Sequence, residues 1–143
     1  MQVRLGRYAA LYVALAVGLT LLAVAIETFA GFAVPSSVVS VVPPALAAML
    51  EGSRIARSAR APMPKSQAWR EALRMTGVAL VINIAMLAIV LALPGSEATL
   101  AASALDVVAL VMAILMALIL LVNRYFLAMG MKNELKRLDR LTR

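Results

Sequence analysis

Apolar residues occur along this chain in long uninterrupted runs rather than at the alternating positions of a half-buried helix or strand. Four runs stand out, at residues 8–29, 34–53, 73–93 and 105–122. About 20 apolar residues cross the ~30 Å hydrocarbon core of a bilayer, so each run is long enough to span it. Because a single run can satisfy its own backbone in hydrocarbon only as a helix, we predict an all-α membrane protein, a four-transmembrane-helix bundle.

The second run carries the pair Pro43-Pro44 near its middle. A proline inside a helix has no N–H for the carbonyl four residues earlier, so the carbonyls of Val39 and Ser40 lose their usual partners. In hydrocarbon these carbonyls need a neighbouring helix, a hydroxyl or water instead. The sequence therefore predicts a second helix that is kinked or broken at Pro43-Pro44. It leaves open whether the first part of this segment is helical.

The positive charges predict how the chain is oriented. All 14 Lys and Arg residues lie at the N-terminus, in the polar stretch from 54 to 74, or in the tail at 123–143. The connector proper covers residues 54–72, and Pro62 and Pro64 mark a non-helical break in it. With four crossings these basic segments share one side of the membrane, and that side is the cytoplasm by the positive-inside rule. Both termini are therefore predicted to be cytoplasmic.

The tail has the pattern of a short amphipathic helix. Met131, Leu135 and Leu138 fall near one helical face, and basic residues surround them. We predict a short, basic amphipathic surface helix on the anionic leaflet over Met131 to Arg143. Arg124, which closes the fourth run, is expected to reach toward the headgroups. The residues expected to contact lipid headgroups are Arg54, Arg57, Arg60, Lys132, Lys136, Arg137 and Arg140.

Composition removes several classes of function. The 143 residues are 64% hydrophobic and include no Cys and no His, and the mean hydropathy is +0.95. We therefore predict a single integral membrane domain over 1–143. The missing residue types exclude disulfides, His-ligated haem, the usual zinc sites and Ser-His or Cys-His catalysis.

We expect no catalytic, cofactor-binding or metal site, and no enzyme activity. The net charge of +7 follows from topology, so we expect no nucleic-acid partner.

A few polar residues inside or at the ends of the runs are candidates for transport or for packing. Glu27 and Asp106 lie at the outer edges of the first and fourth runs, where a charge costs little. Ser40 and Asn83 lie near mid-membrane, close to Pro43-Pro44. Polar groups beside a discontinuous helix form many transporter sites. The alternative is that they are hydrogen-bonding contacts between helices, worth about 1 kcal/mol each.

Small residues recur at four-residue spacing in three places. This spacing lets two helices approach closely, either within one bundle or against a partner. The small residues are Ala10, Ala14 and Gly18; Ala48, Gly52 and Ala56; and Ala109, Ala113 and Ala117.

Glu51 precedes Arg54 by three positions. On a helix this spacing predicts a local ion pair.

Several short motifs stand out along the chain: Ser-x-Val-Pro-Pro-Ala-Leu-Ala-Ala-Met-Leu-Glu-Gly from Ser40, Ala68-Trp69-Arg70, Asn83, Asn123-Arg124-Tyr125-Phe126 and Lys132-Asn133-Glu134-Leu135. Together they resemble the motifs of an uncharacterised family of small four-helix bacterial inner-membrane proteins. The resemblance covers nearly the whole chain. It implies a bacterial inner (plasma) membrane and brings no activity with it.

These observations favour a non-enzymatic accessory or interaction subunit of a larger membrane complex. The alternative is a small oligomeric transporter or channel that uses Glu27, Ser40, Asn83, Asp106 and the proline pair. The expected partners are a bilayer with anionic phospholipids and either a larger membrane complex or further copies of this chain.

Overall fold

The computed structural model describes residues 2–92 and 105–141, and this part of the chain is all helical. Its four helices are α1 (Leu5–Ala30), α2 (Ser36–Ala59), α3 (Lys65–Leu91) and α5 (Leu105–Leu141). Each is long and apolar enough to cross a membrane. The prediction of a multi-pass membrane protein with four membrane-crossing helices is confirmed at this level.

The helices extend beyond the predicted spans into the polar segments. Of the connector predicted at 54–72, only residues 60–64 lie between α2 and α3. Arg60 ends α2 with a left-handed φ of 49°, and its N–H bonds to the carbonyl of Ala56 at 2.9 Å. Pro62 and Pro64 follow, and the residue before a proline avoids helical geometry. The break therefore lies at the two prolines, as predicted.

The tail is not a separate surface helix, and that prediction was wrong. α5 is one helix of 37 residues that continues without a break to Leu141. No proline interrupts its sequence, and Gly130 remains helical. At 1.5 Å per residue it is roughly 55 Å long, well beyond the ~30 Å of bilayer hydrocarbon. The basic residues of the tail are therefore carried on the end of a membrane-crossing helix.

α2 is helical on both sides of Pro43 and Pro44, which are buried within it. The first part of this segment is therefore helical, beginning at Ser36 directly after Pro35. Ser103, which precedes Asp106 by three positions as in a helix capping box, lies outside the described residues.

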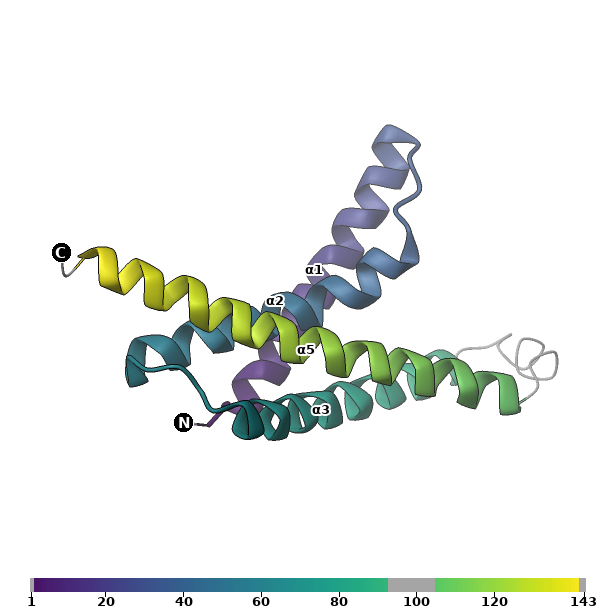
Figure 1. Cartoon of the computed structure of the whole chain (residues 1–143). Helices are drawn as coiled ribbons and strands as arrows, with labels where there is room; N and C mark the ends of the chain where they lie inside the picture. Colours follow the sequence, from purple (N-terminus) through teal and green to yellow (C-terminus); the bar gives the residue numbers. More distant parts are fainter. Residues whose placement is uncertain (1, 93–104, 142–143) are drawn as a thin grey trace.

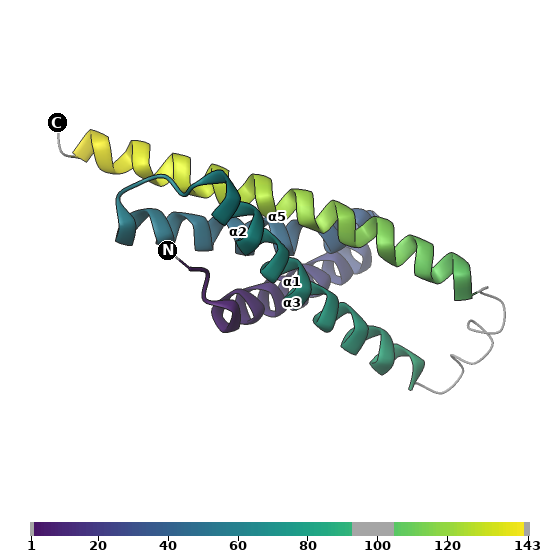
Figure 2. The same ribbon diagram turned by 60° about the horizontal axis from the view of Figure 1, so that its bottom comes forward.

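Both termini lie at one end of the molecule, together with most of the basic residues (Figure 1). We call it the basic end: residues 2–12, 49–76 and 119–141. Towards the opposite end, α1 and the start of α2 diverge from α3 and α5 (Figure 1), and α3 and α5 also separate (Figure 2). α2 and α5 share the most extensive contact. Much of the buried core, including Tyr8, Ile55, Met75 and Leu127, lies at the basic end.

Candidate functional site

Two glycines allow a close approach between α2 and α5 at the basic end. A side-chain carbon on Gly52 would collide with the backbone of Leu127, and one on Gly130 would collide with the backbone of Met49. The hydroxyl of Ser53 also donates to the carbonyl of Gly130 at 3.2 Å. Small residues allow helix backbones in membranes to meet in this way.

The three small-residue patterns therefore differ in what they contact. Ala48 and Ala56 are fully buried beside Gly52, so this pattern serves packing within the chain. Ala10, Ala14 and Gly18 on α1 and Ala109, Ala113 and Ala117 on α5 are exposed.

Three glutamates at the basic end each pair with an arginine three residues later. Arg54 lies 2.9 Å from Glu51, Arg74 lies 3.0 Å from Glu71, and Arg137 lies 3.8 Å from Glu134. The Glu51-Arg54 ion pair was predicted from the sequence and is confirmed. Glu51 and Glu71 are fully buried, and a buried carboxylate needs such partners because desolvation of its charge is unfavourable.

The same glutamates connect separate parts of the chain. Nε of Arg7 lies 3.3 Å from Oε1 of Glu51, which joins α1 to α2, although this oxygen has no aligned hydrogen-bond donor among the described residues. The backbone N–H of Val3 donates to Oε2 of Glu71 at 3.2 Å. This contact holds the N-terminal segment against α3.

Glu134 joins the ends of α2 and α5. Nε of Arg57 donates to Oε1 of Glu134 at 2.8 Å. This hydrogen bond, reinforced by the positive charges of Arg57 and Arg137, holds the pKa of the Glu134 carboxyl below its usual range, although partial burial opposes the shift. The tail of α5 is therefore tied to α2 by a charged contact as well as by the glycine contact.

Two tyrosines of α1 form hydrogen bonds with asparagines of other helices. Tyr8 donates to Oδ1 of Asn123 at 3.0 Å, and Nδ2 of Asn123 donates to the hydroxyl of Thr76 at 3.3 Å. One turn along α1, the hydroxyl of Tyr12 accepts a hydrogen bond from Nδ2 of Asn83 at 3.1 Å. Asn123 is fully buried. These contacts link α1, α3 and α5.

The predicted transport residues that the structure describes lie in different surroundings. Asn83 is bonded to Tyr12, while Glu27 is exposed near the end of α1 and Ser40 is exposed on the first half of α2. Asp106 belongs to α5, but its side chain lies outside the described part. Pro43 and Pro44 are buried in α2. Pro43 also lines an apolar groove of about 170 Å³ between α1 and α2.

The predicted lipid-contacting cations divide into three groups. Arg54, Arg57 and Arg137 are engaged with glutamates of the chain itself. Arg60 terminates α2 and is exposed, as is Arg140. Lys132 and Lys136 line a cavity instead.

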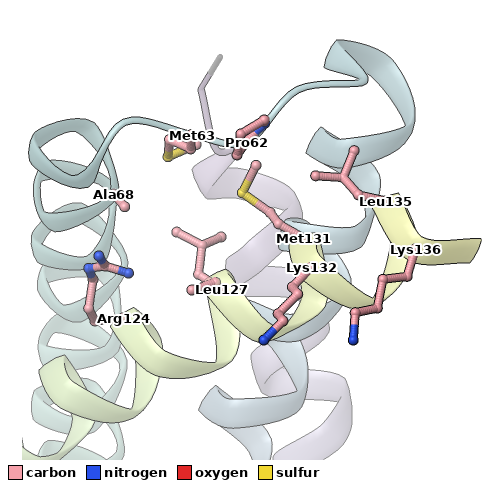
Figure 3. Close-up of a pocket in the computed structure, with 10 residues that line it drawn as sticks. Pro62, Met63, Ala68, Arg124, Leu127, Met131, Lys132, Leu135 and Lys136 are labelled. Carbon is pink, nitrogen blue, oxygen red and sulfur yellow. The ribbon is translucent and has the colours of Figure 1, made fainter. Parts of the chain in front are cut away.

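This cavity of about 410 Å³ lies between α5, the start of α3 and the connector between α2 and α3 (Figure 3). Arg124 lines it beside α3, and its guanidinium carbon lies 5.6 Å from the centre of the Trp69 ring. The lining residues are Pro62, Met63, Ala68, Arg124, Leu127, Ala128, Met131, Lys132, Leu135 and Lys136.

Sequence analysis missed most of these contacts. The repeated Glu-x-x-Arg spacing at Glu51, Glu71 and Glu134 was visible, and it could have indicated that the acids of the basic end are structural. The partnership of Tyr8 with Asn123 joins positions 115 apart, and no local pattern indicates it. In the sequence, Asn123 stands out only as part of the motif Asn123-Arg124-Tyr125-Phe126.

The arrangement suits helix packing and the binding of an anion more readily than proton or group transfer. Within residues 2–92 and 105–141, no three acidic side chains form a group that could hold a metal ion.

Comparison of the chain with known protein families, with curated proteins and with solved structures gives no match.

Proposed function

We propose that this chain is a non-enzymatic accessory or interaction subunit of a larger membrane complex. In this proposal the chain belongs to a bacterial inner membrane, with the basic end in the cytoplasm and α2 bent at Pro43-Pro44. The bacterial assignment depends on the family resemblance of its motifs, and the orientation depends on the distribution of its Lys and Arg residues.

One observation carries the proposal: two asparagines inside the described helices are hydrogen-bonded to side chains of other helices. Asn83 is hydrogen-bonded to Tyr12, and Asn123 is hydrogen-bonded to Tyr8 and Thr76. A transport site instead requires polar groups that can exchange their partners for a substrate. Polar groups committed to holding helices together favour a structural role.

The helices also offer much surface for contact with other membrane proteins. α1 is the least covered of the four, and Val17, Leu21 and Val24 on it are each more than half exposed. Lipid can cover such faces, but helix association in membranes uses the same apolar packing. An accessory subunit would place these faces against its partner.

The test is purification from native membranes at the natural expression level in a mild detergent, followed by mass spectrometry. We expect a larger membrane protein to co-purify in a fixed ratio. A chain that is recovered alone or only with copies of itself, under conditions that preserve known complexes, would contradict the proposal.

A photo-crosslinking leucine analogue locates the contact and provides a control. Placed at Leu21, which is 66% exposed, it is expected to crosslink to the partner protein. Placed at the buried Ile119, it should crosslink only within the chain. Adducts with lipid alone at Leu21, Val111 and Leu118, three exposed positions on α1 and α5, would count against a protein partner.

A small oligomeric transporter or channel is the second candidate, and the proline pair favours it. Two consecutive prolines supply no N–H to the helix at this point, and Pro43 borders the groove between α1 and α2. This candidate predicts that Glu27→Gln and Asn83→Ala each abolish a flux while the protein stays folded. An unchanged flux in both variants would remove the assignment of these residues.

A further inference from the structure

The cavity beside Arg124 combines an apolar wall with an entirely positive set of charges (Figure 3). Leu127 and Met131 contribute to its apolar wall, and its three charged lining residues are Arg124, Lys132 and Lys136. Among the described residues that line it there is no carboxylate. A pocket of this character favours a ligand that is negative at one point and apolar elsewhere.

The cations at this cavity differ from five arginines at the basic end that are held in ion pairs. The ion pairs among residues 2–92 and 105–141 engage Arg7, Arg54, Arg57, Arg74 and Arg137. The glutamates of the basic end are therefore already used by other arginines. The positive charge at the cavity is left for an external anion.

Arg124 is the most specific indication of a ligand. Its Nε is buried and, in the part of the chain that the structure describes, has no hydrogen-bond partner. A buried charged donor without an acceptor is strongly unfavourable. Stacking on Trp69 keeps the guanidinium beside the cavity, where a phosphate oxygen would supply the missing acceptor.

The depth of Arg124 matches a lipid headgroup. It follows Leu105, the first residue of α5, by a stretch of roughly 28 Å at 1.5 Å per residue, close to the ~30 Å thickness of the hydrocarbon. The cavity begins at this level and extends along α5 past Lys132. Trp69 beside it is a residue type that prefers the headgroup region.

We propose that this cavity binds the headgroup of one anionic glycerophospholipid, of the phosphatidylglycerol type. The phosphate accepts hydrogen bonds from Arg124 and Lys132, and Lys136 adds positive charge. The volume of about 410 Å³ falls in the range of ligand pockets, which leaves room for a glycerol headgroup as well as a phosphate. The acyl chains extend from the cavity into the hydrocarbon.

This site is distinct from general attraction between the basic end and an anionic leaflet. It holds one lipid at defined residues, whereas the leaflet attracts every exposed cation. It requires that the chain span a membrane, but it depends on neither the accessory role nor a partner protein.

The single tryptophan of the chain, Trp69, provides the readout. The purified protein is placed in phosphatidylcholine nanodiscs that contain a small fraction of lipid with brominated chains, which quench tryptophan fluorescence at short range. We expect brominated phosphatidylglycerol to quench Trp69 more strongly than brominated phosphatidylcholine at the same fraction. Equal quenching by the two lipids would overturn the proposal.

Substitution of the cavity cations tests the site itself. The combined change Arg124→Gln, Lys132→Gln and Lys136→Gln is expected to reduce the preference for phosphatidylglycerol at least roughly tenfold, because charge-assisted hydrogen bonds are lost. The matched control Arg4→Gln, Lys65→Gln and Arg70→Gln removes three exposed cations outside the cavity. It should leave the preference unchanged, and an equal loss in both variants would mean general surface attraction only.

A competition with inorganic phosphate and two single variants complete the test. Added inorganic phosphate should not remove the preference, and complete displacement by it would show that the ligand is a soluble anion rather than a lipid. If the triple variant does not fold, the exposed Lys132→Gln and Lys136→Gln are measured singly. Each is expected to reduce the preference several-fold, and no change in either would overturn the proposal.

Discussion

At the scale of single residues, Gly52 and Gly130 decide how closely α2 and α5 can approach. Gly52→Ala or Gly130→Ala would drive a methyl group into backbone atoms of the facing helix, and backbone cannot rotate away as a side chain can. Overpacking of this kind costs typically 1–3 kcal/mol or more. We therefore expect either substitution to lower the apparent melting temperature of the protein in detergent by several degrees, measured by circular dichroism.

Gly77→Ala is the matched control, because Gly77 lies on the exposed side of α3 with open space around it. Replacing a helical glycine by alanine stabilises a helix by roughly 0.5–1 kcal/mol. The control should keep or slightly raise the melting temperature. A similar fall in all three variants would show that the effect comes from glycine replacement in general and not from the contact between α2 and α5.

At the scale of elements, the contact between Arg57 on α2 and Glu134 on α5 predicts how stability responds to pH. The pKa of Glu134 is lowered by this contact in the folded protein, whereas an unfolded glutamate has a pKa of about 4.3. A lowered folded pKa contributes stability above the unfolded value, and that stability is lost as pH falls through the folded pKa. The link between the two helices should therefore weaken in acid.

Melting temperatures at neutral pH and in acid, below about pH 4, measure this contribution. Glu134→Gln should have a lower melting temperature than the unchanged protein at neutral pH. Its melting temperature should also fall less on acidification. Glu27→Gln, which removes an exposed acid near the far end of α1, should show the full acid-dependent fall. The prediction is wrong if Glu134→Gln and the unchanged protein respond identically to acid.

The elements themselves were readable from the sequence to different degrees. The four helices follow from runs of apolar residues, and the break after Arg60 follows from Pro62 and Pro64. The length of α5 could not be predicted in the same way, because the hydrophobic run ends at Asn123 and Arg124 while the helix continues to Leu141. A helix continues through polar positions when nothing breaks it and its charged faces find partners, as Glu134 does.

The candidate site was less readable than the helices. The positive lysines at 132 and 136 were visible, but their placement beside Arg124 and the connector depends on how α3 and α5 cross. The use of Asn83 and Asn123 by tyrosines of α1 depends on contacts between residues 71 and 115 positions apart. Such contacts arise from packing in three dimensions and have no local signature.

At the scale of the whole molecule, the separation of charge between its two ends predicts a fixed orientation. Lys and Arg retained on the cytoplasmic side determine topology, and no Lys or Arg occurs between Arg7 and Arg54 or between Arg74 and Arg124. Because the chain contains no cysteine, single cysteines can report the side of the membrane. Ala33→Cys lies in the segment between α1 and α2, and Ser58→Cys lies near the end of α2; both positions are exposed.

We expect a membrane-impermeant maleimide to label Ala33→Cys in cells whose inner membrane is intact, and to label Ser58→Cys only after that membrane is opened. Labelling of both after denaturation is the control for reactivity. The reverse pattern would place the basic end outside the cytoplasm. Since the cytoplasmic leaflet is the anionic one that attracts basic segments, that result would also remove the electrostatic reason for the orientation proposed here.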